Sequence, residues 1–478
     1  MAQLSVLVVS HTFPPDAEVG GKRVARLCRY LPSFGIQPIV LTVQERYYES
    51  RDHSFAIGDG IRVERTAVLP TPFDVYRGLK TALSSDGRSF NSIAGTDRPH
   101  ENEGHTRRPE RFSPLRRHIR ELLGTPDTNW GWFLPATRAG RRLIEGERIA
   151  AIFSSAPSWT PHLIGRNLRK KYPIPWIADF RDAWIGDTWR TPTLPGWRYR
   201  VESRLEASCL NWADLVTCVT DYIRDDFARR YPAMPPTKFV TLTNGYDCDS
   251  SHRSDPPGTS SVPPLTCDEG RTESTPTAGL EGQTQGSRCL VLHLGDLYGG
   301  RRVDAFCQAV QDLVDSGKVN PDSIKILFMG NNDPLIVQAA CQRAPALMRS
   351  NCIEFRDRVS WQEGQRVLAE ANLLLIIQGN HRAVTAKFYE YLPTGKPVLA
   401  IVREGPLSAM VRATCAGLSA DYEDPSEISA RFLEALALRT RSTQEVRSSA
   451  GQYNYRNLAK QLAEWIHELA AVRVGGTR

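Results

Sequence analysis

The stretch LSVLVVSHTFPPDAEVGGKRVARLCRYLPSFGIQPIVLTV, residues 4–43, decides the fold class. Its valine-rich apolar run at 4–10 is typical of a buried parallel strand. Apolar side chains then recur at helical spacing, at Val24, Leu27, Cys28 and Leu31. Gly35 follows as a stop signal, and 36–43 is a second predicted strand. Strand, helix and strand with short connections predict a βαβ unit, which requires a parallel sheet with a right-handed crossover.

The same alternation of strands and helices continues in both halves of the chain. Further strands are predicted at 150–155, 175–180, 214–220 and 238–244, and then at 289–295, 323–330, 352–357, 372–378 and 397–402. The 478 residues exceed the roughly 250 to 300 that one hydrophobic core organises. We therefore predict an α/β protein with two Rossmann-like, doubly wound domains, at 1–248 and 288–442.

Three segments stand apart from these two cores. In 249–287, 23 of 39 residues are Ser, Thr, Pro or Gly, which predicts a flexible linker. A polar insertion at about 84–114 interrupts the first domain. The last segment, 443–478, is predicted to contain a helix, for which we consider a return across the first domain.

Composition excludes several classes of protein. With 41% hydrophobic and 24% charged residues, the chain is typical of a globular protein. Its longest apolar runs are far shorter than the roughly 18 residues of a membrane span, and its start lacks the pattern of a secretory signal, so we expect a cytoplasmic protein. The ten cysteines form no CxxC pair, which argues against a zinc site or a disulfide framework. A net charge of +7 is too small to indicate a nucleic-acid partner.

Glycines precede a predicted helix at the start of each domain. Gly20 and Gly21 lie in the first such loop, and Arg301 and Arg302 end the sequence HLGDLYGGRR in the second. Helix N-termini attract anions, and guanidinium groups bind phosphate oxygens in pairs. The second loop therefore predicts a diphosphate site. A tight turn at Gly20 and Gly21, and solvated surface arginines in the second loop, remain the alternatives.

Lys387 and Glu390 lie three residues apart on a short predicted helix and therefore share one face. The lysine is suited to a phosphate, and the glutamate to two neighbouring ribose hydroxyls. A surface ion pair between them is the alternative. Asp179, Arg181 and Asp182 follow a predicted strand, at the edge where doubly wound sheets bind ligands. A site role and a structural ion-pair network both remain open for these three residues.

Taken together, these segments resemble glycosyltransferase family 4 enzymes of the two-domain GT-B fold. The matching pieces, in order, are FPPDAEVGGKRVARLCRYL at 13–31, ADLVTCVTDYIRDDF at 213–227, NGYD at 244–247, the loop at 295–302 and KFYEYLPTGKPVLAI at 387–401. The resemblance covers the core of both domains. Each motif is weak alone, but their joint order is specific.

The resemblance implies a nucleotide-sugar donor on the second domain, a glycan or lipid-linked acceptor on the first, and sugar transfer with retention between them. It implies that Glu390 holds the donor ribose, that Arg301 contacts the diphosphate, and that Gly20 and Gly21 lie near the phosphates and the acceptor. Such enzymes serve surface polysaccharide or glycoconjugate biosynthesis. No cofactor is implied, because the nucleotide sugar is a substrate.

Two positions depart from the family pattern. Arg382 replaces the leading glutamate of the E-x7-E motif, and an arginine cannot copy a carboxylate. Arg181 and Asp182 stand where many relatives carry a histidine. A GT-B epimerase or hydrolase and a non-catalytic GT-B scaffold therefore remain alternatives, whereas the absence of GxGxxG disfavours a Rossmann oxidoreductase.

Two further patterns concern metals and membranes. Asp247 and Asp249 superficially match a metal-binding DxD motif, but they belong to the turn that leads into the linker, so we expect no metal site. Residues 107–124 combine six arginines with leucines at helical spacing. This segment is either an amphipathic helix packed on its own domain or a basic helix lying on an anionic membrane surface.

Overall fold

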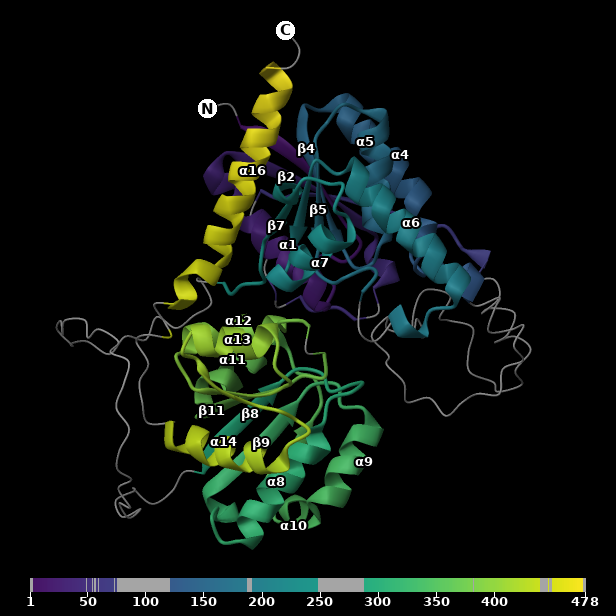
Figure 1. Ribbon diagram of the computed structural model, residues 1–478. Helices are drawn as coiled ribbons and strands as arrows, with labels where there is room; N and C mark the ends of the chain where they lie inside the picture. The colour runs from purple at the N-terminus through teal and green to yellow at the C-terminus, as the bar shows by residue number, and fades with distance from the viewer. Residues whose placement is uncertain are drawn as a thin grey trace, which may run out of the picture.

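The computed structural model describes residues 3–48, 50–53, 55, 57, 58, 60–72, 74, 121–186, 191–247, 288–380, 382–438, 446 and 449–475. They form two α/β domains placed end to end, each built on a parallel sheet (Figure 1). The predicted fold class is confirmed. The insertion predicted at 84–114, the linker predicted at 249–287 and all of the basic segment before residue 121 lie outside the described residues.

The first domain contains the strands β1 Leu4–Ser10, β2 Ile36–Val43, β3 Arg62–Thr66, β4 Ile149–Ala156, β5 Trp176–Phe180, β6 Leu215–Cys218 and β7 Phe239–Thr241, and the helices α1 Val19–Tyr30, α4 Phe133–Gly146, α5 Thr160–Lys171, α6 Gly196–Trp212 and α7 Asp221–Arg230. The second contains β8 Cys289–Leu294, β9 Ile324–Met329, β10 Ile353–Arg356, β11 Leu373–Ile377, β12 Val398–Ile401 and β13 Gly417–Ala420, and α8 Val303–Asp315, α9 Pro334–Arg343, α10 Pro345–Arg349, α11 Trp361–Glu370, α12 Ala386–Tyr391, α13 Pro406–Ala413 and α14 Pro425–Leu438. The long helix α16, Tyr455–Gly475, follows. Short 3₁₀ turns lie at η1 Leu31–Phe34, η2 Glu45–Tyr47, η3 Trp130–Trp132, η4 Thr191–Thr193, η5 Pro236–Lys238, η7 Pro321–Ser323, η8 Leu392–Thr394 and η9 Gly451–Tyr453.

The first sheet has the strand order β3-β2-β1-β4-β5-β6-β7 and separates two apolar cores. Because successive strand residues point to opposite faces, Val6 and Val8 of β1 pack beneath α1 and α16, whereas Leu7 and Val9 pack beneath α4 and α5. Helix α16 runs along the first domain beside α1 (Figure 1). The C-terminal helix thus completes the first domain although it follows the second in the chain.

The second sheet has the order β10-β9-β8-β11-β12-β13. Helices α8, α9 and α14 cover one face of it, and α11, α12 and α13 cover the other. In both sheets the chain reverses its direction of strand addition beside the first strand, between β1 and β4 and between β8 and β11. These reversal points are where open α/β sheets bind ligands, at the carboxyl ends of their strands.

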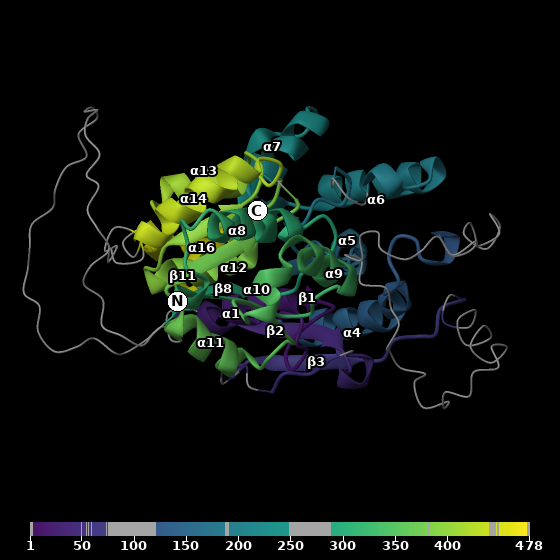
Figure 2. The same cartoon turned by 90° about the horizontal axis from the view of Figure 1, so that it is seen from below.

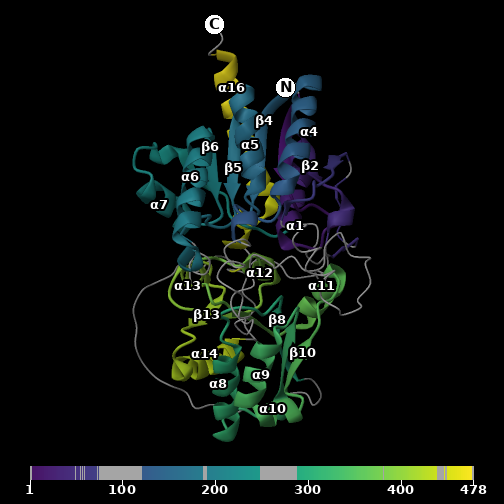
Figure 3. The same ribbon diagram turned by 90° about the vertical axis from the view of Figure 1, so that its right-hand side faces the viewer.

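The carboxyl ends of the two sheets face one another across the domain boundary. Helix α12, which follows β11, lies at the end of the second domain that meets the first (Figure 3). Seen from below, α11 and β3 lie toward the same side of the molecule (Figure 2), and the rings of Phe55 and Trp361 meet there with 6.2 Å between their centres. Both reversal points therefore open onto one interdomain boundary.

The two chain segments that lead to and from the second domain pair with each other. The backbone N–H of Tyr246 donates to the carbonyl of Tyr453 over 3.0 Å, and the N–H of Tyr455 donates to the carbonyl of Tyr246 over 2.9 Å. Gly245 is required beside this pairing, because a Cβ there would lie 2.3 Å from the carbonyl oxygen of Tyr453. The two connections are thus tied together at the base of the first domain.

Within the described part of the chain, no helix combines the length and apolar character that crossing a bilayer requires.

Candidate functional site

Gly20 and Gly21 lie in the first turn of α1, against the loops that follow β1 and β5. A Cβ on Gly20 would lie 1.7 Å from Nη1 of Arg181, so a side chain at position 20 would displace the guanidinium. A Cβ on Gly21 would come within 3.0 Å of the backbone nitrogen of Phe13. The sequence therefore needs glycine here for close approach, and the structure brings Arg181 to the N-terminus of α1.

The Arg181 side chain is held by backbone carbonyls. Its Nε donates to the carbonyl of Ala156 over 3.2 Å, and its Nη2 donates to the carbonyl of Pro157. No carboxylate lies within ion-pair distance of it among the described residues. Burial lowers the pKa of this guanidinium, while the charges of Asp182 and Asp179 act in the opposite direction. A largely desolvated cation fixed in this way is suited to bind an anion.

Asp179 is placed differently, because it is fully buried beneath the boundary. Its carboxylate accepts hydrogen bonds from Arg23 over 3.0 Å, from Ser155 over 2.7 Å and from Thr217 over 2.8 Å. Burial by itself raises the pKa of this carboxyl, but the charge and hydrogen bond of Arg23 and the two hydroxyls outweigh burial and hold the pKa below its usual range. Asp179 therefore takes part in the structural ion-pair network that the sequence left open.

The loop that carries Arg181 and the exposed Asp182 is anchored by two acids that sequence reasoning missed. Glu202 and Glu206 lie one turn apart on α6, and both side chains are buried. Glu202 accepts a hydrogen bond from Nε1 of Trp184 over 3.0 Å, and Glu206 accepts one from the backbone N–H of Ile185 over 2.9 Å. Acids at four-residue spacing on the inner face of a predicted helix were the available signal.

In the second domain, Lys387 of α12 points back toward β8. Its Nζ lies 3.0 Å from Nε2 of His293, whose Nδ1 lies 3.1 Å from the carbonyl oxygen of Leu375. Burial, together with the charges of Lys387 and Arg301, moves the pKa of His293 well below its usual value. The neutral ring therefore donates from Nδ1 and accepts from Lys387 at Nε2. His293, which the sequence analysis did not select, aims the ammonium group.

Gly295 lies directly beneath this ammonium group. Its φ of 130° is a conformation that favours glycine. A Cβ there would lie 2.8 Å from Nζ of Lys387. Burial and the charge of Arg301 lower the pKa of Lys387 well below its usual value. Two basic side chains, Lys387 and Arg301, thus lie close together beside the loop that follows β8.

The two arginines of the predicted diphosphate loop separate in the structure. Arg301 donates from Nη1 to the carbonyl of Asp296, and its guanidinium carbon lies 4.0 Å from the ring centre of Tyr298. Arg302 instead forms an ion pair with Asp304 over 3.0 Å, and its side chain is 46% exposed. The structure therefore brings Arg301, but not Arg302, together with Lys387.

Glu390 forms an ion pair with Arg26 of α1 across the domain boundary, with 3.0 Å between Oε1 and Nη1. The interpretation as a surface ion pair with Lys387 is wrong, because the partner comes from the other domain. Arg26 is buried, and its guanidinium lies over the rings of Phe55 and Tyr455. Because Arg26 contacts Oε1, the Oε2 atom of Glu390 has no partner among the described residues and is available to another donor, and 26% of the side chain is exposed.

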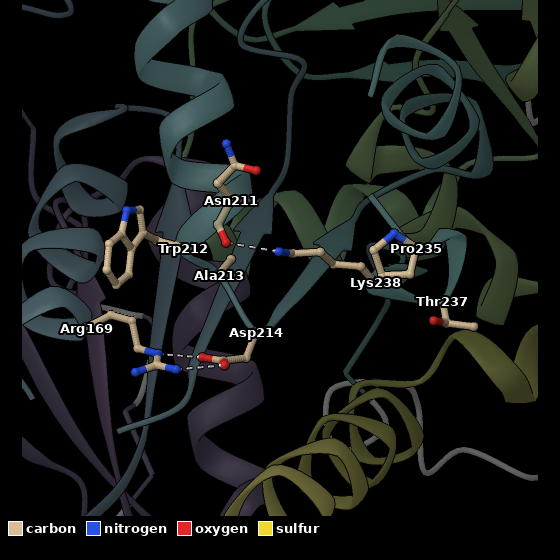
Figure 4. Close-up of a pocket in the computed structure, with 8 residues that line it drawn as sticks. All are labelled: Arg169, Asn211, Trp212, Ala213, Asp214, Pro235, Thr237 and Lys238. Atoms are coloured by element: carbon tan, nitrogen blue, oxygen red, sulfur yellow. Dashed lines mark hydrogen bonds and ion pairs between the residues drawn. The ribbon is translucent and has the colours of Figure 1, made fainter. Parts of the chain in front are cut away.

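A pocket of about 420 Å³ lies elsewhere on the first domain (Figure 4). It is lined by Arg169, Asn211, Trp212, Ala213, Asp214, Pro235, Thr237 and Lys238. Asp214 accepts two bonds from Arg169 there, over 2.8 and 3.0 Å, and Lys238 donates to the carbonyl of Asn211. These residues lie at the amino ends of β6 and β7, opposite the edge where ligands bind. We therefore place the candidate site at the domain boundary.

Asp247, the first residue of the DxD-like pattern, has a structural role. Asp247 accepts hydrogen bonds from Tyr30 and, over 3.2 Å, from Arg29, and Asp249 lies outside the described residues. Over the residues described, no group of three or more His, Cys, Asp or Glu side chains is arranged to hold a metal ion.

Comparison with known proteins connects this geometry to a family. Residues 94–250 match the family described as Glycosyltransferase Family 4. A 98-residue stretch, 20% of the chain, is 30% identical to alpha-maltose-1-phosphate synthase of Mycolicibacterium smegmatis and spans 25% of that relative.

Solved structures resemble the whole chain. Sucrose-phosphate synthase from Thermosynechococcus elongatus has a TM-score of 0.61 at 13% identity and covers 98% of this chain and 100% of its own. Anabaena HepE in complex with UDP and glucose has a TM-score of 0.56 at 12% identity and covers 97% and 100%. The whole-chain likeness shows that this protein has the two-domain GT-B fold, and the match to Glycosyltransferase Family 4 extends over residues 94–250.

Proposed function

We propose that this protein is a glycosyltransferase that takes a sugar from a nucleotide-sugar donor. The observation that carries the proposal is the pair of neighbouring basic side chains Lys387, which lies above Gly295, and Arg301, neither of which has a carboxylate within ion-pair distance among the described residues. Fixed cations without acidic partners match a diphosphate. Glu390, three residues after Lys387, offers a free carboxylate oxygen to ribose hydroxyls. The HepE structure, which holds UDP and glucose, supports this assignment by its fold.

The proposed reaction needs fixed charges on both sides of the bond that breaks. Positive charge builds on the sugar ring and negative charge on the departing phosphate. Lys387, Arg301 and the N-terminus of α1 stabilise the phosphate, and domain closure excludes water. In this proposal a metal ion is not required, because side chains and helix dipoles neutralise the leaving group. We propose retention of configuration on family resemblance.

The acceptor in this proposal binds to the first domain, near Gly20, Arg181 and Asp182. In this proposal Asp179 does not contact the substrate. Its carboxylate instead fixes the Arg23 side chain and the carboxyl end of β5. We propose a glycan or a lipid-linked acceptor in the biosynthesis of surface polysaccharide or another glycoconjugate, and a place of action in the cytoplasm, at or near the membrane surface.

The direct test incubates the protein with UDP-, ADP- and GDP-sugars, with and without lipid-linked acceptors, and measures release of nucleoside diphosphate. Release that rises with one donor and one acceptor is the expected result. Tight binding of a nucleoside diphosphate without any release would favour a non-catalytic scaffold, and no binding at all would contradict the proposal.

Glu390→Ala is expected to weaken nucleoside diphosphate binding by about 1.5 to 3 kcal/mol, because a charged hydrogen bond to ribose is lost. The same change leaves the buried Arg26 without its partner. Arg26→Gln separates the two effects, since it frees Glu390 but keeps the ribose contact. Calorimetry of both variants checks this, and equal affinity of wild type and Glu390→Ala would contradict the ribose assignment.

Arg301→Ala is expected to weaken binding of the nucleoside diphosphate far more than binding of the free nucleoside, because the side chain faces phosphate and not base. Calorimetric titration with both ligands measures the difference. Arg412→Ala is the matched control, because Arg412 is exposed and pairs with Glu404 on the surface. If Arg301→Ala lowers both affinities by the same factor, the phosphate assignment is wrong.

A further inference from the structure

Arg382 extends from the loop between β11 and α12 toward the first domain. Its Nη1 donates to the carbonyl of Gly186 over 3.4 Å, and its guanidinium carbon lies 5.7 Å from the ring centre of Tyr222. Gly186 ends the loop that also carries Arg181. The Arg382 side chain therefore reaches across the boundary to the loop that follows β5 in the first domain.

The guanidinium of Arg382 has unused binding capacity. It carries five N–H donors, and the one side-chain hydrogen bond that it forms with the described residues is long at 3.4 Å. A ring contact leaves the N–H groups in the guanidinium plane available. Among the described residues no carboxylate lies within ion-pair distance of Arg382, although the side chain is half-buried. A half-buried cation without a counter-charge is costly unless a ligand supplies one.

The boundary also holds more cations than the donor diphosphate uses. Under the proposed function, on which this step rests, Lys387 and Arg301 take the diphosphate, which bears one negative charge on each phosphate. The carboxylate of Glu390 is already paired with Arg26. Arg181 and Arg382 are then left over, one from each domain, and neither has an acidic partner in the described part of the chain.

We propose that Arg382 recognises a second anionic group, a carboxylate or phosphate on a substrate, separate from the donor diphosphate. The substrate class is then either a nucleotide-linked sugar acid or a phosphorylated acceptor. The chemistry shared by both is a planar or tetrahedral oxyanion that accepts two parallel N–H bonds from a guanidinium fork.

The test uses matched pairs that differ only in the anion. For the donor, nucleotide esters of glucose and galactose are compared with those of glucuronic and galacturonic acid, on the nucleotide that binds best. For the acceptor, glucose is compared with glucose 6-phosphate, added to protein saturated with nucleoside diphosphate. Calorimetry measures each affinity for wild type, Arg382→Ala, Arg382→Lys, Arg382→Glu and the surface control Arg412→Ala.

Wild type is expected to bind the anionic member of one pair about tenfold to a hundredfold more tightly than the neutral member. Preference for the sugar acids assigns the anion to the donor, and preference for glucose 6-phosphate assigns it to the acceptor. Arg382→Ala removes the preference, Arg382→Lys keeps part of it and Arg382→Glu reverses it. Affinity for the bare nucleoside diphosphate changes by less than about twofold in Arg382→Ala.

Two results would overturn this inference but leave the proposed function in place. In the first, wild type binds the neutral and anionic members of each pair equally and still binds the bare nucleoside diphosphate. In the second, the preference for the anionic member survives in Arg382→Ala. Failure of wild type to bind any nucleoside diphosphate is a different result. It removes the proposed function, and the inference falls with it.

Discussion

Replacing Asp179 with alanine is expected to lower the free energy of unfolding by about 3 to 5 kcal/mol, because the buried Arg23 guanidinium loses its counter-charge. Urea unfolding of wild type and variant measures the loss. Glu404→Ala is the matched control, because it removes an exposed carboxylate that pairs with Arg412 and is expected to change stability by less than about 0.5 kcal/mol. Equal stability of Asp179→Ala and wild type would show that the network does not support the fold.

The same carboxyl gives a pH dependence with a defined sign. Its pKa in the folded protein lies below the usual range, so its contribution is fully present above the unfolded pKa of about 3.9. The contribution is lost as the pH falls through the folded pKa. The stability gap between wild type and Asp179→Asn is therefore expected to be constant near neutral pH and to narrow in acid. A gap that widens in acid would contradict the assignment.

Replacing Lys387 with methionine is expected to reduce sugar transfer by about a hundredfold to a thousandfold, the usual cost of removing one fixed group that stabilises developing negative charge. Methionine keeps a similar apolar length but lacks the ammonium group that His293 aims. Steady-state kinetics on the best donor measures the effect, with Arg412→Ala as the control. An unchanged turnover number would exclude Lys387 from the phosphate site.

Proton uptake gives Lys387 a second readout. Its pKa is lowered in the free protein by burial and by Arg301, and a bound diphosphate favours the charged form. Binding therefore raises the pKa of Lys387, so a proton is taken up wherever the solution pH lies between the pKa values of the free and the bound protein, and affinity is expected to fall as the pH rises through the pKa of the free protein. Calorimetry in buffers of different ionisation enthalpy measures this uptake in wild type, and Lys387→Met is expected to abolish it.

Much of the fold could be predicted from local sequence patterns. The strands β1 and β2 have the predicted bounds. These segments are strongly periodic or continuously apolar, so burial identifies them without knowledge of their neighbours. The edge strand β3, with the sequence RVERT, and the four-residue β13 were not predicted. Their residues are polar or few, and only pairing with β2 and β12 makes them strands.

The candidate site was predictable in its parts and not in its connections. The sequence placed Gly20, Lys387 and Glu390 at loops and helix starts that follow buried strands, where the structure has them. The sequence could not separate the roles of Arg301 and Arg302, because they are adjacent residues of the same type. Only the structure shows that Arg302 pairs with Asp304. Sequence reasoning also missed His293, which reads as one polar residue within a buried strand.

By itself, the sequence determined that this protein has two parallel α/β domains and which residues lie at the carboxyl ends of their strands, because alternation and apolar periodicity are local properties of the chain. Only the tertiary structure decided which charges meet. Arg26 and Glu390 are 364 residues apart, Gly186 and Arg382 are 196 apart, and His293 and Lys387 are 94 apart. Such partners share no local pattern, because their contact depends on how one sheet is wound and on how the two domains face each other.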